Sequence, residues 1–319
     1  MDGHDLELFR RTVLDALRPR ARTQVDDVLE NLGWRDALDH DRPSAIAVVF
    51  ECLGSVCASS TALDDVLGTV VNPARAAESA MLIPGPDLSQ PPAHIDGREL
   101  SLRGLASTRL TKTGELLVVA RTEKGDAATT VRSSELTLRA VSGMDPGLGL
   151  LEIVGTVAVP SMTPLPPRAW AAAVRDGQLA LAHELVGAAD AMLELARQHA
   201  IDRVQFGGPI GSFQAVSHRL ADTLVAIEAA RAGLAAAWDD PVPGSGALAK
   251  ALAGRAARTA ARHGQQVLGG IGFTSEHTFH RYVRRVLLLD ELLGTARSLT
   301  WDLGRRVVQD RHLPPPLRL

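Results

Sequence analysis

Two stretches in the last third of this 319-residue chain combine residue types that can hold an anionic, hydrogen-bonding ligand. The first, DRVQFGGPIGSFQAVSHRLAD at residues 202–222, places Arg203 and Gln214 on either side of a Gly207-Gly208 pair. Glycine accepts the backbone angles of a tight turn, so one helix is predicted to end here and another to begin. Arg203 and Gln214 then project from the junction toward a ligand. In the plainer interpretation, Arg203 merely caps the end of the first helix.

The second stretch, QQVLGGIGFTSEHTFHRYVRR at residues 265–285, is centred on a GGIG turn. Its glycines allow a ligand to approach the backbone closely and offer N–H groups to a phosphate. The turn is weak evidence by itself, because the same glycines suit a C-cap between two helices. His277 and His280, three residues apart, lack further ligands at metal-site spacing, so hydrogen bonding at a helix start is the favoured interpretation.

Three regions of the chain have to position these stretches. Residues 1–78 are predicted to be helical, including a helical stretch over residues 43–67. Residues 79–160 hold short apolar or alternating runs separated by glycine and proline, which indicates antiparallel strands. Residues 161–319 are predicted to form a proline-rich linker and then four long helices, the last over residues 279–309. Long helices with short connections are typical of a four-helix bundle. The predicted fold class is α+β, with a helical domain, a middle β domain and a C-terminal helical bundle.

The composition argues against several functional classes. A net charge of −3 lacks the basic excess of a nucleic-acid-binding protein, and 3% aromatic residues leave few stacking platforms for bases. The N-terminus has no apolar signal core, and no apolar run approaches the length of a membrane span, so we expect a cytoplasmic protein without a membrane anchor. Cys52 and Cys57, the two cysteines, are predicted to be buried thiols.

Together, the two stretches resemble the acyl-CoA dehydrogenase family. The motif RxQFGxPIxxFQ, followed further along by QxxGGIGFT and HRYxRR, is a specific combination. The resemblance covers nearly the whole chain and is strongest over residues 169–295. The order of a helical region, a β region and a helical region is also that of the family. The resemblance therefore implies the fold of an acyl-CoA dehydrogenase.

The resemblance also implies that FAD lies across a subunit boundary. The first motif would reach FAD held mainly by a neighbouring subunit, and the second would meet its pyrophosphate and adenine end. A guanidinium, amides and a glycine turn suit a dinucleotide. The implied FAD contacts are Arg203, Gln205, Phe206, Gln214, Gln266, Gly269, Gly270 and Thr295.

The base of the family's reaction is missing from this chain. That reaction is α,β-dehydrogenation of an acyl-CoA thioester, in which a carboxylate removes the α-proton and hydride passes to the flavin. In most members the carboxylate is a Glu directly before a Gly-Thr pair, and Leu293 holds this position here. In a minority it lies on the first bundle helix, near Gly177 here, so the resemblance implies no catalytic residue. Nearby Asp176, Asp290 and Glu291 are interpreted as solvated or structural charges.

The β region departs from the family as well, because it lacks the Thr-Glu-Pro-like, Gly-Ser-rich segment that wraps the flavin ring. The chain therefore resembles the non-basic subunit of actinobacterial α2β2 acyl-CoA dehydrogenases, notably those of steroid side-chain degradation. The resemblance implies a second acyl-CoA dehydrogenase subunit carrying the Glu, an acyl-CoA substrate, and electron-transfer flavoprotein as acceptor.

Two alternatives stay open at this point. The first is a scaffold protein that kept the fold and lost the redox role. The second is a homo-oligomeric dehydrogenase with a relocated base such as Glu291, although a helix continuing through this region would point Glu291 about 160° away from Leu293. Arg284 and Arg285 could meet a CoA phosphate, but pairing with Asp290 and Glu291 is favoured.

Overall fold

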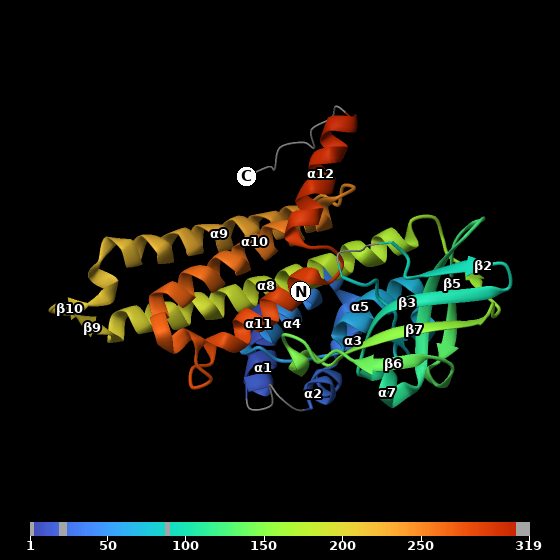
Figure 1. Cartoon of the computed structure of the whole chain (residues 1–319), viewed down its shortest axis with the longest axis horizontal. Coiled ribbons are helices and arrows are strands. Elements are labelled where there is room, and N and C mark those ends of the chain that lie inside the picture. Colours follow the sequence, from blue (N-terminus) through green and yellow to red (C-terminus); the bar gives the residue numbers. More distant parts are fainter. Residues whose placement is uncertain (1–2, 19–23, 87–89, 311–319) are drawn as a thin grey trace. The chain divides into compact units, whose positions relative to one another are not determined.

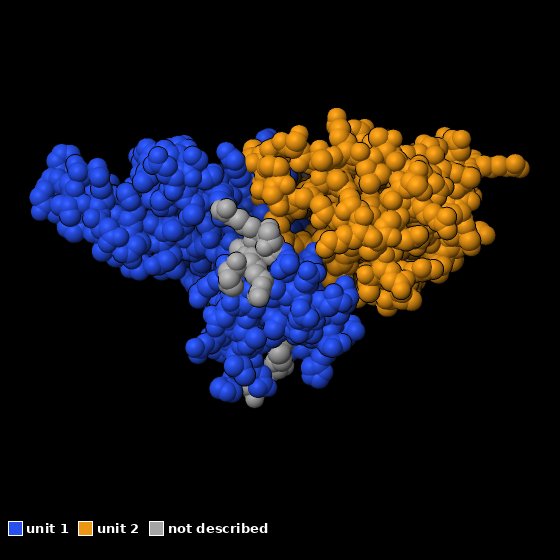
Figure 2. Space-filling view, turned by 90° about the horizontal axis from the view of Figure 1, so that it is seen from below, with its two compact units in different colours: residues 1–58, 181–290, 295–319 blue, residues 59–180, 291–294 orange. Residues whose placement is uncertain are grey.

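A computed structural model describes residues 3–18, 24–86 and 90–310 of the chain (Figure 1). The chain forms two compact units, and each is discontinuous in sequence (Figure 2). Unit 1 holds residues 1–58, 181–290 and 295–319, and unit 2 holds residues 59–180 and 291–294. The division of the chain into domains at residues 1–78, 79–160 and 161–319 stays a prediction. Among the described helices, none has the length and apolar character needed to cross a bilayer.

Unit 1 opens with four helices: α1 (Gly3–Leu17), α2 (Val25–Asn31), α3 (Trp34–His40) and α4 (Arg42–Val56). Asp41 caps α4, since its carboxylate accepts the N–H of Ser44. The helical stretch predicted over residues 43–67 consists of two helices. Cys57 adopts a left-handed backbone (φ 51°) that ends α4, and the chain enters a new helix only after Thr61. Cys52 and Cys57 are buried free thiols, as predicted.

Five further helices follow in the C-terminal part: α8 (Ala169–Asp202), α9 (Gln214–Asp239), α10 (Ser245–Leu268), α11 (Phe279–Glu291) and α12 (Ala296–Asp310). Figure 1 shows α9 and α10 running side by side. Helix α10 presents a buried stripe of alanine and glycine, which allows close helix packing. Two glycines bring α4 against α8, because a Cβ on Gly54 would lie 2.0 Å from the Glu184 carbonyl oxygen and one on Gly187 would lie 2.2 Å from that of Glu51.

The last predicted helix, over residues 279–309, is divided into α11 and α12. Leu293 and Gly294 take left-handed backbones (φ 55° and 100°), which an α-helix cannot contain. Asp290 stabilises the junction within unit 1, because its carboxylate accepts the N–H of Ala296 at 2.9 Å and a hydrogen bond from Arg258 at 2.7 Å. The buried Lys250 donates to the Asp290 carbonyl oxygen at 2.9 Å.

Unit 2 contains one sheet with the strand order β6-β7-β3-β2-β4-β5-β8. It is mostly antiparallel, as predicted, with β1 and β2 both pairing in parallel with β4. The parallel pairs arise because β3 and α7 carry the chain across β2 before β4 begins, which local turn signals do not reveal. The strands are β1 (Ala80–Met81), β2 (Ala93–Asp96), β3 (Glu99–Ser107), β4 (Glu115–Thr122), β5 (Gly125–Arg132), β6 (Thr137–Ala140), β7 (Leu150–Ala158) and β8 (Thr163–Pro164).

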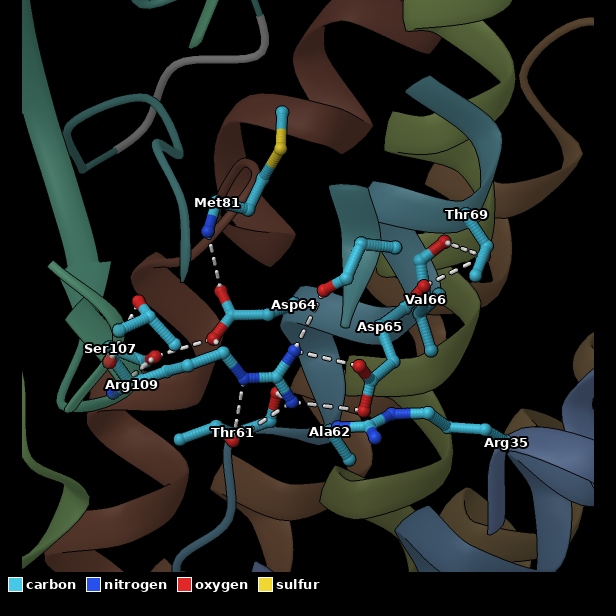
Figure 3. A network of polar contacts seen from close by, with 12 residues as sticks. Arg35, Thr61, Ala62, Asp64, Asp65, Val66, Thr69, Met81, Ser107 and Arg109 are labelled. Atoms are coloured by element: carbon cyan, nitrogen blue, oxygen red, sulfur yellow. Dashed lines mark hydrogen bonds and ion pairs between the residues drawn. The ribbon is translucent and has the colours of Figure 1, made fainter. Parts of the chain in front are cut away.

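Three short helices complete unit 2: α5 (Ala62–Val71), α6 (Pro73–Ala76) and α7 (Arg109–Thr113). A buried polar network joins α5, α7 and β1 (Figure 3). Arg109 donates to both carboxylate oxygens of Asp65, at 2.7 and 2.9 Å, and lies 3.6 Å from Asp64. It also donates to the hydroxyl of Thr61. Asp64 in turn accepts the N–H of Met81 at 2.9 Å.

This network predicts a pH-dependent stability. Burial raises the pKa of Asp64 to about 6, although the neighbouring Arg109 opposes the shift. An unfolded aspartate titrates near pKa ~3.9, so the folded protein binds the extra proton between about pH 4 and 6. The stabilisation is complete below about pH 4 and is lost as the pH rises through about 6. Relative to Asp64→Asn, the wild-type unfolding free energy should be about 1 kcal/mol larger at pH 5 than at pH 7.5.

Urea denaturation of both proteins at the two pH values measures this difference. The comparison with Asp64→Asn cancels carboxylates that titrate elsewhere in the chain. A difference between the two proteins that stays constant with pH would show that Asp64 is ionised throughout.

Candidate functional site

The first motif forms a tight hairpin between two bundle helices in unit 1. After α8 ends, β9 (Val204–Gln205) pairs with β10 (Gly208–Pro209). The two turn residues, Phe206 and Gly207, have φ values of 52° and 88°. Positive φ at both central positions is the pattern of a type I′ hairpin turn, which explains the glycine. The chain then passes through the short helix η4 (Ile210–Ser212) and begins α9 at Gln214.

The predicted ligand-binding residues of this motif face outward. Arg203, Gln205 and Gln214 are exposed, and Phe206 exposes 94% of its surface. The Phe206 ring makes an edge contact with Phe213, with ring centroids 6.1 Å apart. The Arg203 side chain forms no hydrogen bond or ion pair with any described residue, so the capping interpretation finds no support there. The motif therefore presents an exposed ring and an exposed guanidinium on the same hairpin.

The second motif exposes its glycine backbone to solvent. Gln266 lies exposed in the last turn of α10, and the chain continues into η5 (Gly269–Phe273). A Cβ at Gly269 or Gly270 would meet no atom within 4 Å, so a ligand can approach these residues closely. Gly269 has φ 62°, which favours glycine. Phe273 exposes 69% of its surface and so adds a second exposed aromatic residue.

The fold brings the two motifs to one end of the bundle. Val267 of the second motif packs in a small apolar cluster with Ala196 and Ala200 of α8, and the partly buried Ile210, Val216 and Leu220 of the first motif cover this cluster. The His263 ring lies 3.0 Å from the Thr223 hydroxyl, which ties α10 to α9. The pKa of His199 is lowered, first by burial and then by the positive charges of His277 and Arg203.

These residues fit FAD as a ligand. The arginine matches phosphate oxygens, and the open space at Gly269 and Gly270 lets a ligand reach the backbone. The glutamine amides match hydrogen-bonding groups, and the exposed rings match an aromatic ring system. Thr295 lies elsewhere in unit 1. Its hydroxyl accepts the N–H of Ser298 and so caps α12. The adjacent Ala296 contacts α10 at Gly254, twelve residues before Gln266, which corresponds to about 18 Å along the helix.

The two positions at which family members carry their base lie next to each other in unit 2. A Cβ on Gly177 would lie 2.7 Å from the Leu293 side chain and 2.8 Å from that of Leu67. Leu293 and Leu67 are fully buried. Gln178 donates to the Leu293 carbonyl oxygen at 3.0 Å and so holds the left-handed turn. An apolar, filled interior occupies the place where a proton acceptor would be needed.

The nearby acidic residues are structural. Asp176 is buried and pairs with Arg175 at 2.6 Å, and Asp290 is buried in the α11–α12 junction, so neither is solvated. Glu291 is the last residue of α11, and the predicted angle to Leu293 does not apply because the helix stops between them. It is half-buried.

Arg285 does not pair with Asp290 as expected. Five residues span about 140° beyond one full turn of a helix, so the two side chains leave α11 on different faces. Arg285 is buried and instead donates to the carbonyl oxygen of Ala58, with Glu184 at 3.6 Å. The histidine interpretation is confirmed, because His277 accepts the N–H of Phe279 at the start of α11 and the His280 ring lies within hydrogen-bonding distance of the His277 carbonyl.

Comparisons with known proteins agree with this geometry. Residues 170–308 match the family described as "Acyl-CoA dehydrogenase, C-terminal domain". The protein named acyl-CoA dehydrogenase IpdE2 of Mycobacterium tuberculosis is 40% identical over 176 residues, which cover 55% of this chain and 54% of that protein. The protein named acyl-CoA dehydrogenase FadE34 of the same organism is 44% identical over 121 residues, or 36% of this chain and 17% of that protein. The chain spans about half the length, or less, of these curated relatives.

Solved structures match over almost the whole chain. The structure titled "Tcur3481-Tcur3483 steroid ACAD G363A variant" has a TM-score of 0.81 at 22% identity, covering 97% of this chain and 99% of that one. The ChsE4-ChsE5 complex from Mycobacterium tuberculosis has a TM-score of 0.76 at 21% identity, covering 97% and 98%. These likenesses establish the fold. The matching family model and the named relatives identify residues 170–308 as an acyl-CoA dehydrogenase C-terminal domain, in a chain that has the fold of these enzymes throughout.

Proposed function

We propose that this chain is one subunit of an FAD-dependent acyl-CoA dehydrogenase that contributes FAD contacts to a partner subunit carrying the catalytic Glu. One observation carries the proposal. Both base positions, Leu293 and Gly177, lie in a filled apolar interior, although the FAD-facing residues of the bundle are kept and exposed. A subunit of this kind serves a neighbour's cofactor and lacks a proton acceptor of its own.

Each exposed residue has a distinct role in this proposal. Arg203 would pair with a phosphate oxygen, and the open space beside Gly269 and Gly270 would let the cofactor approach the backbone closely. The amides of Gln214 and Gln266 would orient the cofactor, and the ring of Phe206 would shield it from water. FAD, when bound, supplies the hydride acceptor of the reaction.

The partner in this proposal is a second acyl-CoA dehydrogenase subunit in an α2β2 heterotetramer. The named two-component structures of similar fold support this assembly, and the "steroid ACAD" in one title supports a steroid-derived acyl-CoA as substrate. We propose electron-transfer flavoprotein as the electron acceptor, in line with the family. The protein carries these functions in the cytoplasm in this proposal.

Co-expression with a candidate partner dehydrogenase tests the assembly. We expect the chain purified alone to lack FAD and activity, and the complex to hold FAD and oxidise acyl-CoA. A chain that is yellow and active alone would refute the heteromer and favour a relocated base such as Glu291. A partner that holds FAD and works equally well without this chain would identify the chain as a scaffold.

Arg203→Gln in the complex provides a residue-level test. The change removes a charged hydrogen bond to phosphate, which contributes about 1.5–3 kcal/mol, so the FAD dissociation constant should rise by roughly 10- to 100-fold. Titration of FAD into the cofactor-free complex measures it. Arg197→Gln is the matched control, because Arg197 lies exposed near the same end of α8 and pairs with Glu194. Equal FAD affinity in the two variants would remove Arg203 from the site.

A further inference from the structure

The N-terminus of α10 lacks hydrogen bonds that normally close the start of a helix. Gly244 adopts a left-handed backbone (φ 94°) directly before the helix, and no side chain caps the first turn. The N–H groups of Ser245 and Leu248 bond to carbonyl oxygens just before them in the chain. The N–H groups of Gly246 and Ala247 donate to no described residue. Because α10 is a long helix, the positive end of its dipole adds to these two open donors.

The hydroxyl of Ser245 is a buried polar group without a partner. Ser245 is only 9% exposed, and its hydroxyl forms no hydrogen bond with a described residue. The Cα–Cβ bonds of a helix tilt toward its N-terminus, so a hydroxyl on the first residue of α10 faces the end of the helix. Most buried side-chain polar atoms in folded proteins are hydrogen-bonded. The orphan hydroxyl therefore indicates a bound group at this helix end, and its burial restricts that group to a small one.

A cation lies beside the same helix end. Arg306 of α12 places a guanidinium nitrogen 3.9 Å from the point where a Cβ on Gly244 would stand. The Arg306 side chain is exposed and forms no hydrogen bond or ion pair with any described residue. The preceding residue, Arg305, pairs instead with Asp302 at 2.7 Å. Arg306 is therefore available to an anion that the α10 N-terminus also contacts.

The acidic residues near this helix end do not occupy it. Asp239 and Asp240 stand at the end of α9 and are exposed, and neither accepts an N–H from the first turn of α10. Water and salt screen exposed charges of this kind. The open donors are two backbone N–H groups, a hydroxyl and a guanidinium. Donors of these types at a helix start bind phosphate oxygens in many proteins.

We propose that the N-terminus of α10 binds a small tetrahedral oxyanion, either inorganic phosphate or the phosphate group of a small monoester. Its oxygens would accept hydrogen bonds from the two open N–H groups, the Ser245 hydroxyl and Arg306. The site is separate from the residues proposed to contact FAD, because Ser245 and Gln266 lie at opposite ends of α10, roughly 30 Å apart along the helix. The proposal does not depend on the proposed dehydrogenase function.

NMR titration of the full chain tests the proposal, with the amide signals of Gly246 and Ala247 as the readout. The probes are inorganic phosphate, glycerol 3-phosphate as a small monoester, and acetate as a carboxylate, all at the same ionic strength. We expect saturable shifts of both amide signals with at least one of the two phosphates, and the tighter-binding phosphate identifies the source of the ligand. Because the readout is local, binding at the distant end of the bundle is observed separately.

Arg306→Gln and Ser245→Ala should each weaken phosphate binding roughly 10-fold or more, because each removes a hydrogen bond to a charged group. Arg305→Gln is the matched control, since Arg305 is exposed on the same helix and pairs with Asp302. Ser245→Ala also separates binding from folding, because the loss of an unpartnered hydroxyl should leave the stability of the ligand-free chain undiminished. Thermal melting without phosphate checks this.

Three results would overturn the proposal. Amide shifts that do not saturate with either phosphate would mean that no site exists at this helix end. An equal loss of affinity in Arg305→Gln and Arg306→Gln would reveal only a general effect of charge. Tighter binding of acetate than of both phosphates would replace the oxyanion by a carboxylate ligand, such as an acidic side chain of a partner protein.

Discussion

Replacing Arg109 by methionine is expected to lower the unfolding free energy by about 3–5 kcal/mol. The guanidinium is buried and pairs through two hydrogen bonds with Asp65, with Asp64 also within 3.6 Å. Without it, the carboxylates of Asp64 and Asp65 would lose the guanidinium that both face in the interior of unit 2 (Figure 3). The penalty for an uncompensated buried charge is larger than the worth of the pair itself. Chemical denaturation monitored by circular dichroism measures the change.

A double variant tests the role of charge at Arg109, and a surface variant serves as the control. Adding Asp65→Asn to Arg109→Met should recover part of the lost stability, because the buried negative charge of Asp65 is then removed together with the guanidinium. Arg139→Met is the control for an ordinary surface pair: Arg139 is 79% exposed where it meets Glu152, and its loss should cost less than about 1 kcal/mol. If Arg109→Met were as mild as Arg139→Met, the buried network would not be important for the stability of the fold.

The candidate site was predictable because its signals are local. The hairpin at Phe206 and Gly207 requires positive φ at both positions, and the GGIG turn leaves its first two glycines open, so motif and geometry coincide. That both motifs meet at one end of the bundle depends on Val267 packing against α8, which no local pattern specifies. Thr295 was included from the resemblance and stays a prediction, and its hydroxyl accepts the N–H of Ser298 at the start of α12.

The break between α11 and α12 and the partners of Arg285 were not predicted, because both depend on contacts between residues far apart in the sequence. The break needs a leucine with a left-handed backbone, which sequence patterns do not favour. It is also stabilised by hydrogen bonds from Lys250 and Arg258 to Asp290, and Lys250 lies about forty residues before Asp290 in the sequence. The pairing of Arg285 with Glu184 and the Ala58 carbonyl is equally non-local. A buried lysine and two buried arginines can be recognised in the sequence only as charges, because the partners that neutralise them are supplied by the fold.

The proposed division of labour between subunits rests on where polar and apolar residues are found. Arg203 is exposed beside Phe206, and the 94%-exposed Phe206 ring would leave water once a partner subunit and its cofactor covered it, as proposed. A filled apolar interior at the base positions is favourable for stability and incompatible with proton abstraction. In the proposed function, the chain therefore combines an exposed surface for a partner's cofactor with a buried leucine at the position of the family's carboxylate.

Leu293→Glu tests whether this chain could become active simply by regaining the family's carboxylate. We expect no activity from the variant alone, and a loss of unfolding free energy of several kcal/mol at neutral pH. Leu293 is fully buried against Leu67 and Gly177, so a glutamate there would be desolvated without a described cationic partner at the position. Burial raises a carboxyl pKa, so the variant should recover stability as the pH falls and the side chain becomes neutral.

Leu293→Gln separates the charge from the loss of apolar packing. Gln has the shape of Glu without its ionisation, so the pH-dependent part of the destabilisation should be absent from it, and the pH-independent part should be common to both variants. Leu293→Met, which keeps volume and apolar character, should cost less than about 1.5 kcal/mol. Turnover of acyl-CoA by the Leu293→Glu chain alone, with bound FAD, would mean that a substrate site persists beside Leu293. The chain would then be a dehydrogenase that has lost one residue, and its dependence on a partner's carboxylate would have to be abandoned.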